Sequence, residues 1–222
     1  MTAGMGRLRR VPPFEQGITL GDFFVPVRVG ERASSRQRHI SLILVGVVVM
    51  AASAQFAMRI PGTDVPLTGQ TFGVLVTATA LGFRRGVASI GLYLLLGLFL
   101  PIYAGGASGA QHVAAWQAGH LVLGATGGYL IGFLFSGALV GRLAELGWDR
   151  RYAGALAAML LGNAVIYVVG LPWLAAALSL GPAQAIAQGL TPFLVGDAVK
   201  FALAAAVFPI GWWLVGRRPS DR

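Results

Sequence analysis

The sequence contains no cysteine and little charge of either sign. Without cysteine, the chain can form no disulfide and has no thiol chemistry. Only 11% of its 222 residues are charged, whereas 56% are hydrophobic and the mean hydropathy is +0.72. This composition is typical of a protein that lies within a lipid bilayer rather than of a soluble domain.

The sequence also lacks the motifs of several enzyme classes. It has no GxxxxGK[ST] phosphate-binding loop, so it cannot drive transport with an ATP site of its own. The glycine-rich run ATGGYLIG (125–132) lies inside an apolar segment and follows no strand, which excludes a dinucleotide-binding loop. His112 and His120 have no acidic neighbour, so no metal site is predicted. We therefore predict neither an enzyme nor a bound cofactor.

Six apolar runs predict an all-α integral membrane domain over residues 40–216. A membrane-spanning helix needs about 20 mostly apolar residues. The second run is the most polar of the six, and the segment 178–189 is too short to span, which leaves it as a short amphipathic helix or a loop. The predicted spans are 40–58, 66–83, 86–103, 121–143, 152–176 and 190–216.

The arginines lie almost entirely on one side of this arrangement. Of the sixteen arginines, only Arg59 falls on the opposite side. Because Lys and Arg concentrate in cytoplasmic loops, both termini are predicted to be cytoplasmic, in a multi-pass protein of the cytoplasmic membrane. This placement also accounts for the net charge of +9 without nucleic-acid binding.

The basic stretch 1–39 is predicted to be a weakly ordered cytoplasmic extension, and 217–222 a short cytoplasmic tail. Ala52-Ser53-Ala54 resembles a signal-peptidase site. The polar region before the first apolar run is, however, far longer than the n-region of a signal peptide. We therefore expect the first run to remain as a membrane span.

The last apolar run carries Asp197 and Lys200, which is the only lysine in the chain. Residues three apart share a face of a helix, and the predicted topology puts both in the outer half of the membrane. A charge at mid-bilayer costs about 3 kcal/mol, so such groups face the protein interior and are paired. Two compatible interpretations stay open: an ion pair that stiffens the helix, or a ligand site with one acceptor and one strong donor.

Other polar side chains in the apolar runs are candidates for the same site. Asn163 and Tyr167 are four residues apart, and hence on one face of the fifth predicted span. Gln70 lies near the outer end of the second span, and Tyr129 lies in the fourth. Contact with a ligand and a role in helix packing or membrane anchoring are both compatible with their positions.

The outer loop 104–120 is long and uncharged. It is either a lid over an outer pocket or a plain surface loop. Trp116 within it either covers an apolar ligand or lies among lipid headgroups.

A succession of stretches from about residue 42 to 215 resembles a known family. In order, they are VPLTGQTFGVL, GFRRG, LYLLLGLFLPIYAGG, ATGGYLIGF, GNAVIYVVGLPWL and TPFLVGDAVK. Together they resemble the BioY family, the biotin-specific substrate-binding components (S-components) of energy-coupling-factor (ECF) transporters. One departure is GATGGY, where the usual family element is GPTGGY.

The resemblance implies an S-component-like bundle that binds biotin from outside with high affinity. The family's glycine–aspartate–lysine element maps onto Gly196, Asp197 and Lys200. It implies that Asp197 accepts a ureido N–H of biotin, and that Lys200 donates either to the ureido carbonyl or to the carboxylate. It also implies a transmembrane coupling subunit and two ATPase subunits as partners, with the loaded protein toppling in the membrane.

Three alternative functions follow from the same residues. One is an S-component for another small vitamin. Another is a membrane enzyme, or a structural or assembly subunit, in which Asp197 and Lys200 form a structural pair. The third is a transporter that is active without partners.

Overall fold

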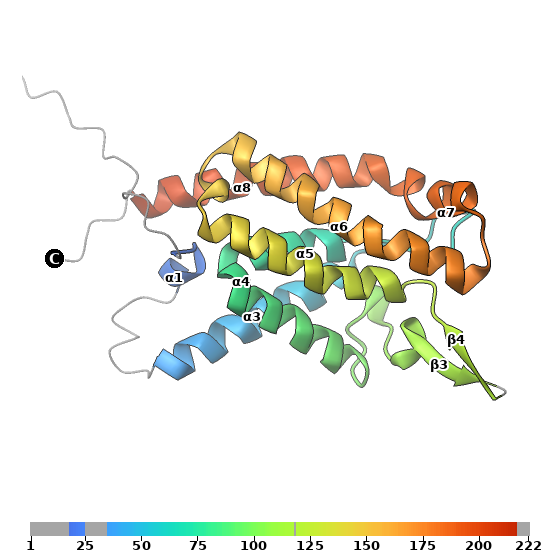
Figure 1. Cartoon of the computed structure of the whole chain (residues 1–222). Coiled ribbons are helices and arrows are strands. Elements are labelled where there is room, and N and C mark those ends of the chain that lie inside the picture. The colour runs from blue at the N-terminus through green and yellow to red at the C-terminus, as the bar shows by residue number, and fades with distance from the viewer. Residues whose placement is uncertain (1–17, 25–34, 118, 217–222) are drawn as a thin grey trace, which may run out of the picture.

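Five long helices, two short helices and two small hairpins make up the computed structural model, which describes residues 18–24, 35–117 and 119–216. Helices α5, α6 and α8 run alongside one another, and α3 and α4 cover one side of them (Figure 1). The helices are α1 (Gly21–Phe24), α3 (Ser35–Gln55), α4 (Gln70–Gly97), α5 (Gly127–Glu145), α6 (Tyr152–Leu178), α7 (Pro182–Gly189) and α8 (Leu194–Gly216).

The strands form two antiparallel pairs, and short 3-10 turns complete the connections. Strand β1 (Ala57–Met58) pairs with β2 (Leu67–Thr68), and β3 (Ala114–Gln117) pairs with β4 (His120–Leu123). The 3-10 turns are η1 (Ala104–Gly106), η2 (Ala110–His112), η3 (Trp148–Arg150) and η4 (Thr191–Phe193).

Four stretches of the described chain are long and apolar enough to cross a membrane. They are 36–55, 127–145, 152–178 and 182–215, the last of which joins α7 to α8. The predicted spans 66–83 and 86–103 correspond to α4, which is not among the four. The count of six spans and the cytoplasmic termini therefore stay predictions.

The predicted fourth span began too early. Residues 120–123 form β4, and α5 starts only at Gly127. Gly119 has a left-handed backbone (φ 83°) that turns the chain back, so the apolar residues after it pair as a strand. A short apolar run does not distinguish a strand from a helix by its periodicity. The segment 178–189 contains the short helix α7, one of the two outcomes expected for it.

Helix α4 consists of two segments, 70–81 and 83–97, that meet at Gly82. The backbone there (φ 77°, ψ −175°) is readily accessible only to glycine. The segments fold back on each other, since a Cβ added to Gly86 would lie 2.9 Å from the Cα of Ala78. Glu145 of α5 caps the second segment by accepting the Phe83 N–H at 2.9 Å.

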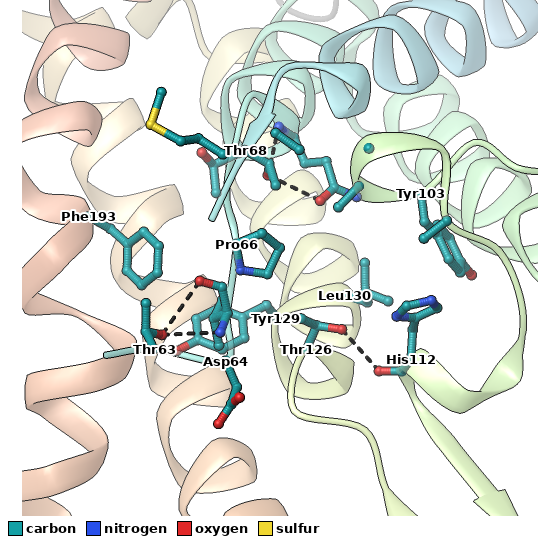
Figure 2. A pocket seen from close by; sticks show the side chains of 18 of the residues that line it. Thr63, Asp64, Pro66, Thr68, Tyr103, His112, Thr126, Tyr129, Leu130 and Phe193 are labelled. Atoms are coloured by element: carbon teal, nitrogen blue, oxygen red, sulfur yellow. Dashed lines mark hydrogen bonds between the residues drawn. The ribbon is translucent and has the colours of Figure 1, made fainter. Parts of the chain in front are cut away.

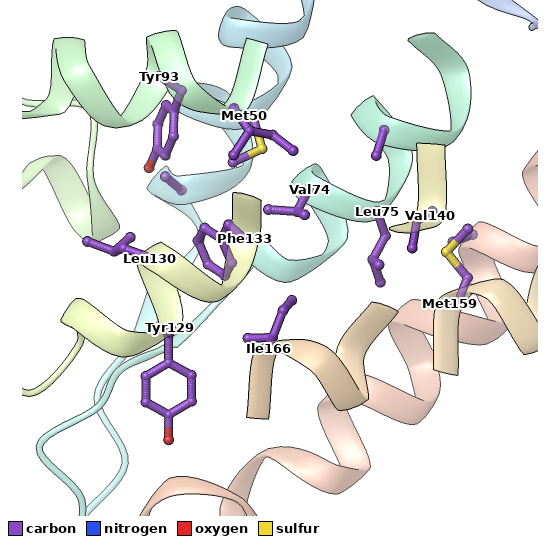
Figure 3. Close-up of a cluster of buried hydrophobic side chains, with 14 of the residues drawn as sticks. Met50, Val74, Leu75, Tyr93, Tyr129, Leu130, Phe133, Val140, Met159 and Ile166 are labelled. Atoms are coloured by element: carbon purple, nitrogen blue, oxygen red, sulfur yellow. The ribbon is translucent and has the colours of Figure 1, made fainter. Parts of the chain in front are cut away.

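Apolar side chains from α3 to α6 meet in one buried core (Figure 3). Met50, Leu75 and Val140 are among the fully buried members. Glycines let the helix backbones approach closely: a Cβ on Gly132 would lie 3.1 Å from the backbone of Ile166. Small residues at helix contacts are how membrane helices gain packing without a hydrophobic driving force between them.

Asp22 fixes α1 to one end of the bundle, which we call the arginine-rich end. Its carboxylate accepts two hydrogen bonds from Arg85, at 2.8 and 3.0 Å, and one from the Thr19 N–H at 3.0 Å. Burial opposes ionisation of this group, but the hydrogen bonds from Arg85 and Thr19 outweigh it and lower the pKa of Asp22. Phe23 adds an edge-on contact with Trp212 of α8, with ring centroids 5.8 Å apart.

Of the predicted extension 1–39, the structure describes 18–24 and 35–39. The remainder of that extension lies outside the described residues, as does the predicted tail 217–222. The described part 18–24 packs against α4 and α8, so at least this stretch has a defined position.

Asp149 in η3 is a buried carboxyl at the same end. Its Oδ2 accepts the indole N–H of Trp212 at 2.7 Å, while its Oδ1 has no hydrogen-bond partner among the described residues. Burial raises the pKa of Asp149 to about 6, and the Trp212 hydrogen bond and the charge of Arg150 offset this only in part.

Substitution of Gly82 tests the reversal. We expect Gly82→Ala to lower the free energy of unfolding by about 1–3 kcal/mol, because the residue must hold a left-handed backbone. Its new Cβ would also lie 2.9 Å from Glu145 Oε1 and disturb the cap. Gly91→Ala, in the second segment with only Leu134 nearby at 3.8 Å, is the matched control and should be neutral or slightly stabilising. Thermal unfolding in detergent measures both variants. Equal unfolding midpoints would contradict the requirement for glycine at the reversal in α4.

The raised pKa of Asp149 predicts a pH dependence of stability. The folded state binds more protons than the unfolded state between about pH 4 and 6, so stability falls as the pH rises through that window. The loss should be on the order of 2–3 kcal/mol. Asp149→Asn keeps an acceptor for Trp212 and should remove this component. Unfolding midpoints of both proteins from pH 4 to 7 test it, and parallel profiles would contradict it.

Candidate ligand-binding site

A cavity of about 530 Å³, whose lining side chains are drawn in Figure 2, lies at the end of the bundle opposite the arginine-rich end, and we call this the cavity end. It receives side chains from the β1–β2 connection, the start of α4, the 103–112 loop, the start of α5, the middle of α6 and the start of α8. Its size is that of a small-molecule site. Aromatic rings supply much of its wall: Tyr103, Tyr129, Phe133, Tyr167 and Phe193.

Asp197 lines the part of the cavity formed by the helices, which we call the inner wall. It carries a charge and is only 2% exposed. Its Oδ2 accepts the Tyr167 hydroxyl at 2.5 Å and the Asn163 amide at 3.0 Å, and its Oδ1 accepts Lys200 at 3.1 Å. It lies in the first turn of α8, where the helix dipole favours a negative charge. A carboxylate that would be costly alone is thus neutralised and hydrogen-bonded by two helices.

Lys200 connects α8 to α4. Besides Asp197, its ammonium donates to the hydroxyl of Thr71 at 3.0 Å. Thr71 lines the cavity, whereas Lys200 and Asn163 lie behind Asp197 rather than on the lining. The ion pair expected from the sequence therefore exists, and it stands directly beside a cavity.

Gln70 forms a second polar wall at the start of α4. Its amide N–H donates to the hydroxyl of Tyr93 at 2.7 Å, and its carbonyl accepts from Thr68 at 3.1 Å. The Tyr93 hydroxyl in turn donates to the carbonyl of Ile102 at 3.0 Å. Gln70 is buried, lines the cavity and is held in one orientation by this chain of hydrogen bonds.

Tyr129 closes the wall between α5 and α7. Its hydroxyl donates to the carbonyl of Gly189 at 2.9 Å, and its ring meets that of Tyr167 edge-on with centroids 6.2 Å apart. Of the six residues predicted for the site, the cavity is lined by Asp197, Tyr167, Gln70 and Tyr129, while Asn163 and Lys200 support Asp197 from behind.

The outer loop 104–120 contributes its first part to the cavity. Ala104, Gly105, Ala107 and His112 line it, and Thr126 fixes His112 by donating to its carbonyl at 3.1 Å. Trp116 is not among the lining residues, so the cavity gives no support to the one of its two predicted positions in which it covers a ligand.

Sequence reasoning missed Thr71, Thr126, Phe193 and the β1–β2 connection. The threonines that make the second predicted span polar were a usable indication of Thr71. The exposed residues Arg59 and Asp64 line the cavity where it reaches the surface, although neither stands in an apolar run.

The model of the BioY family matches residues 29–217, and this range includes every residue of the cavity. The chain belongs to the BioY family. The resemblance predicted from the sequence is thereby confirmed. Helix α1 and its Asp22 lie before the matched range.

Curated relatives and a solved structure agree with this assignment to the BioY family. The chain is 34% identical over 174 residues to "Probable biotin transporter BioY" of Pyrococcus horikoshii, covering 78% of this chain and 94% of the relative. It is 32% identical over 167 residues to "Biotin transporter BioY" of Thermotoga maritima, covering 75% and 92%. The crystal structure of the S-component for biotin from an ECF-type ABC transporter aligns with a TM-score of 0.67 at 25% identity, over 83% of this chain and 96% of that one. The predicted S-component-like, largely helical fold is confirmed.

The site geometry predicts how the charged pair contributes to stability. Lys200→Met leaves the carboxylate of Asp197 buried without its counterion, and we expect it to lower the free energy of unfolding by about 3–5 kcal/mol. The double variant Asp197→Asn/Lys200→Met removes both charges and should recover most of that loss. Thermal unfolding of the single and double variants in detergent measures the coupling. Additive losses in the double variant would contradict an electrostatic pair.

Proposed function

We propose that the chain binds biotin and takes it up across the cytoplasmic membrane as the substrate-specific component of an ECF-type transporter. The observation that carries the proposal is the match to the BioY family over nearly the whole described bundle. The relatives of Pyrococcus and Thermotoga are called biotin transporters, and the solved structure is an S-component for biotin. The protein acts by binding and release, with no chemical reaction on the substrate.

Asp197 is the proposed acceptor for a ureido N–H of biotin. A carboxylate offers about four acceptor positions, and Tyr167, Asn163 and Lys200 occupy three of them. The remaining position suits one N–H donor from the cavity. Because its other partners are already in place, the group needs no reorganisation when the ligand arrives.

Lys200 and Gln70 are the proposed donors to biotin. The ammonium has three N–H groups, of which Asp197 and Thr71 accept two. The Gln70 amide has two, of which Tyr93 accepts one, and the second has no partner among the described residues. Gln70 can donate directly to the ureido carbonyl or to the carboxylate of the ligand, whereas Lys200 would first have to turn toward the cavity beside the lining residue Thr71. The aromatic side chains, including Tyr129 and Tyr167, would hold the thioether ring.

Selectivity follows from the polar groups of this wall. A ligand without matching donors and acceptors leaves the acceptor position of Asp197 and the second amide N–H of Gln70 unpaired in a buried place, and each unpaired group costs binding free energy. Transport driven by ATP would need partners, because the sequence has no phosphate-binding loop. A transmembrane coupling subunit and two ATPase subunits would supply the driving force.

A biotin titration on the purified chain tests the proposal. We expect saturable, high-affinity binding, and we expect Asp197→Asn to weaken it by about 10–100-fold, the cost of about 1.5–3 kcal/mol for a hydrogen bond to a charged group. Asp149→Asn is the matched control: it makes the same change at another buried carboxyl, at the opposite end of the bundle, and should leave the affinity unchanged.

Two further measurements separate the alternatives. Titrations with thiamine and riboflavin identify a component for another vitamin, and failure to bind biotin would refute the proposal. Unchanged affinity in Asp197→Asn would assign the Asp197–Lys200 pair to structure alone. Biotin uptake by cells that lack every coupling subunit would show that the chain transports without an ECF module.

A further inference from the structure

The β3–β4 hairpin has two faces of different character. Its register places Trp116 opposite Leu121 and Gln117 opposite His120. Because side chains alternate along a strand, the first pair and the second pair point to opposite faces of the hairpin. One face carries Ala114, Trp116, Leu121 and Leu123, and is wholly apolar.

The outer half of the apolar face is not covered by the described part of the chain, whereas Ala114 and Leu123 near the base are half-buried. Trp116 is 73% exposed and Leu121 is 59% exposed, although they are large side chains and direct cross-strand neighbours. On the opposite face, Gln117 and His120 form the exposed pair at the tip, and the apolar pair Ala115 and Val122 nearer the base is half-buried. Figure 1 shows the hairpin standing away from the side of the bundle, near the end occupied by α7.

The surroundings of the hairpin match a membrane surface rather than water. No Asp, Glu, Lys or Arg occurs between Arg85 and Arg142, so the hairpin and both of its flanks are uncharged. The loop that leads to it is joined to the end of α4, where the Gly109 N–H donates to the carbonyl of Gly97 at 2.9 Å. Leu95 in the last turns of α4 and Phe99 just beyond it are large apolar side chains that are also exposed.

We propose that the β3–β4 hairpin lies in the membrane–water interface at the cavity end, bound to the phospholipid surface. Trp116 and Leu121 enter the boundary between headgroups and acyl chains, and Gln117 and His120 face the headgroups and water. An exposed tryptophan suits this position, because its ring is apolar while its N–H finds polar partners there. An amphipathic surface element gains free energy in proportion to the apolar area that it buries in lipid.

The base of this hairpin is also a wall of the cavity. The Gly124 N–H donates to the carbonyl of Val113 at 2.9 Å, which closes the hairpin. The adjoining pair, His112 and Thr126, are hydrogen-bonded to each other and both line the cavity. Lipid binding by the hairpin therefore sets the depth of this wall relative to the membrane surface.

Single-cysteine spin labelling tests the proposal, and the cysteine-free sequence makes it direct. The full chain, carrying Trp116→Cys, Leu121→Cys, Gln117→Cys or His120→Cys one at a time, is labelled and reconstituted in phosphatidylcholine–phosphatidylglycerol vesicles. Collision rates of the label with bilayer-dissolved oxygen and with a water-soluble nickel chelate are compared. We expect the oxygen-to-nickel ratio to exceed unity at 116 and 121 and to fall below unity at 117 and 120.

The four sites control one another, because the same hairpin carries both faces. Each variant is accepted only if it elutes as a monodisperse species in detergent, and Leu121→Cys tests the apolar face independently of Trp116→Cys. Ratios below unity at all four sites would place the hairpin in water and overturn the proposal. Labels at 116 and 121 shielded from both reagents would also overturn it, in favour of a protein partner or a second copy on that face. None of these readouts depends on biotin.

Discussion

The buried carboxylate of Asp197 is the constraint around which the cavity end is organised. A negative charge in the apolar part of a membrane protein is tolerated only where donors and a counterion surround it. The donors come from α6, as Tyr167 and Asn163, and from α8, as Lys200. Lys200 then reaches α4 through Thr71. One charge thereby links three helices beside the inner wall of the cavity.

The charged groups at the two ends of the bundle are paired in different ways. At the arginine-rich end, Asp22 and Glu145 bind arginines and free backbone N–H groups, and they hold a short segment and a chain reversal in place. At the cavity end, the polar groups bind one another and leave a few positions open. Between the ends, glycines such as Gly132 allow apolar helices to pack closely. The charged groups of the two ends therefore direct the packing, whereas the buried polar side chains between them, such as Thr77 and Ser136, carry only hydroxyls.

The sequence predicted the parts of the site that depend on helical spacing. Asp197 with Lys200, and Asn163 with Tyr167, follow from residues three and four apart in apolar runs. The contact between these two pairs does not follow, because spacing within one helix says nothing about which helices are neighbours. The same holds for two other hydrogen bonds between residues far apart in the sequence, from Lys200 to Thr71 and from Tyr129 to Gly189.

The helices that form from long apolar runs were predicted well. The features that depend on single glycines or on short runs were predicted poorly. The runs that became α3, α6 and α8 were found within a few residues of their ends. The reversal at Gly82 depends on a single backbone conformation, which hydropathy does not report. The β3–β4 hairpin follows from a left-handed Gly119 within a stretch of small residues that has no clear period.

The unequal attachment of the cavity walls bears on how a ligand is recognised. Asp197 and Tyr129 are held by hydrogen bonds to another helix, and Gln70 is held by one to Tyr93 in the second segment of its own helix α4. The β1–β2 connection is held mainly by local bonds, such as that from the Val65 N–H to the Thr63 hydroxyl at 3.1 Å. A fixed inner wall can discriminate between ligands, because its unpaired groups cannot move to find other partners. Recognition of the ligand's polar groups is therefore assigned to the helices, while the β1–β2 connection, anchored in the core by Val65, completes the wall.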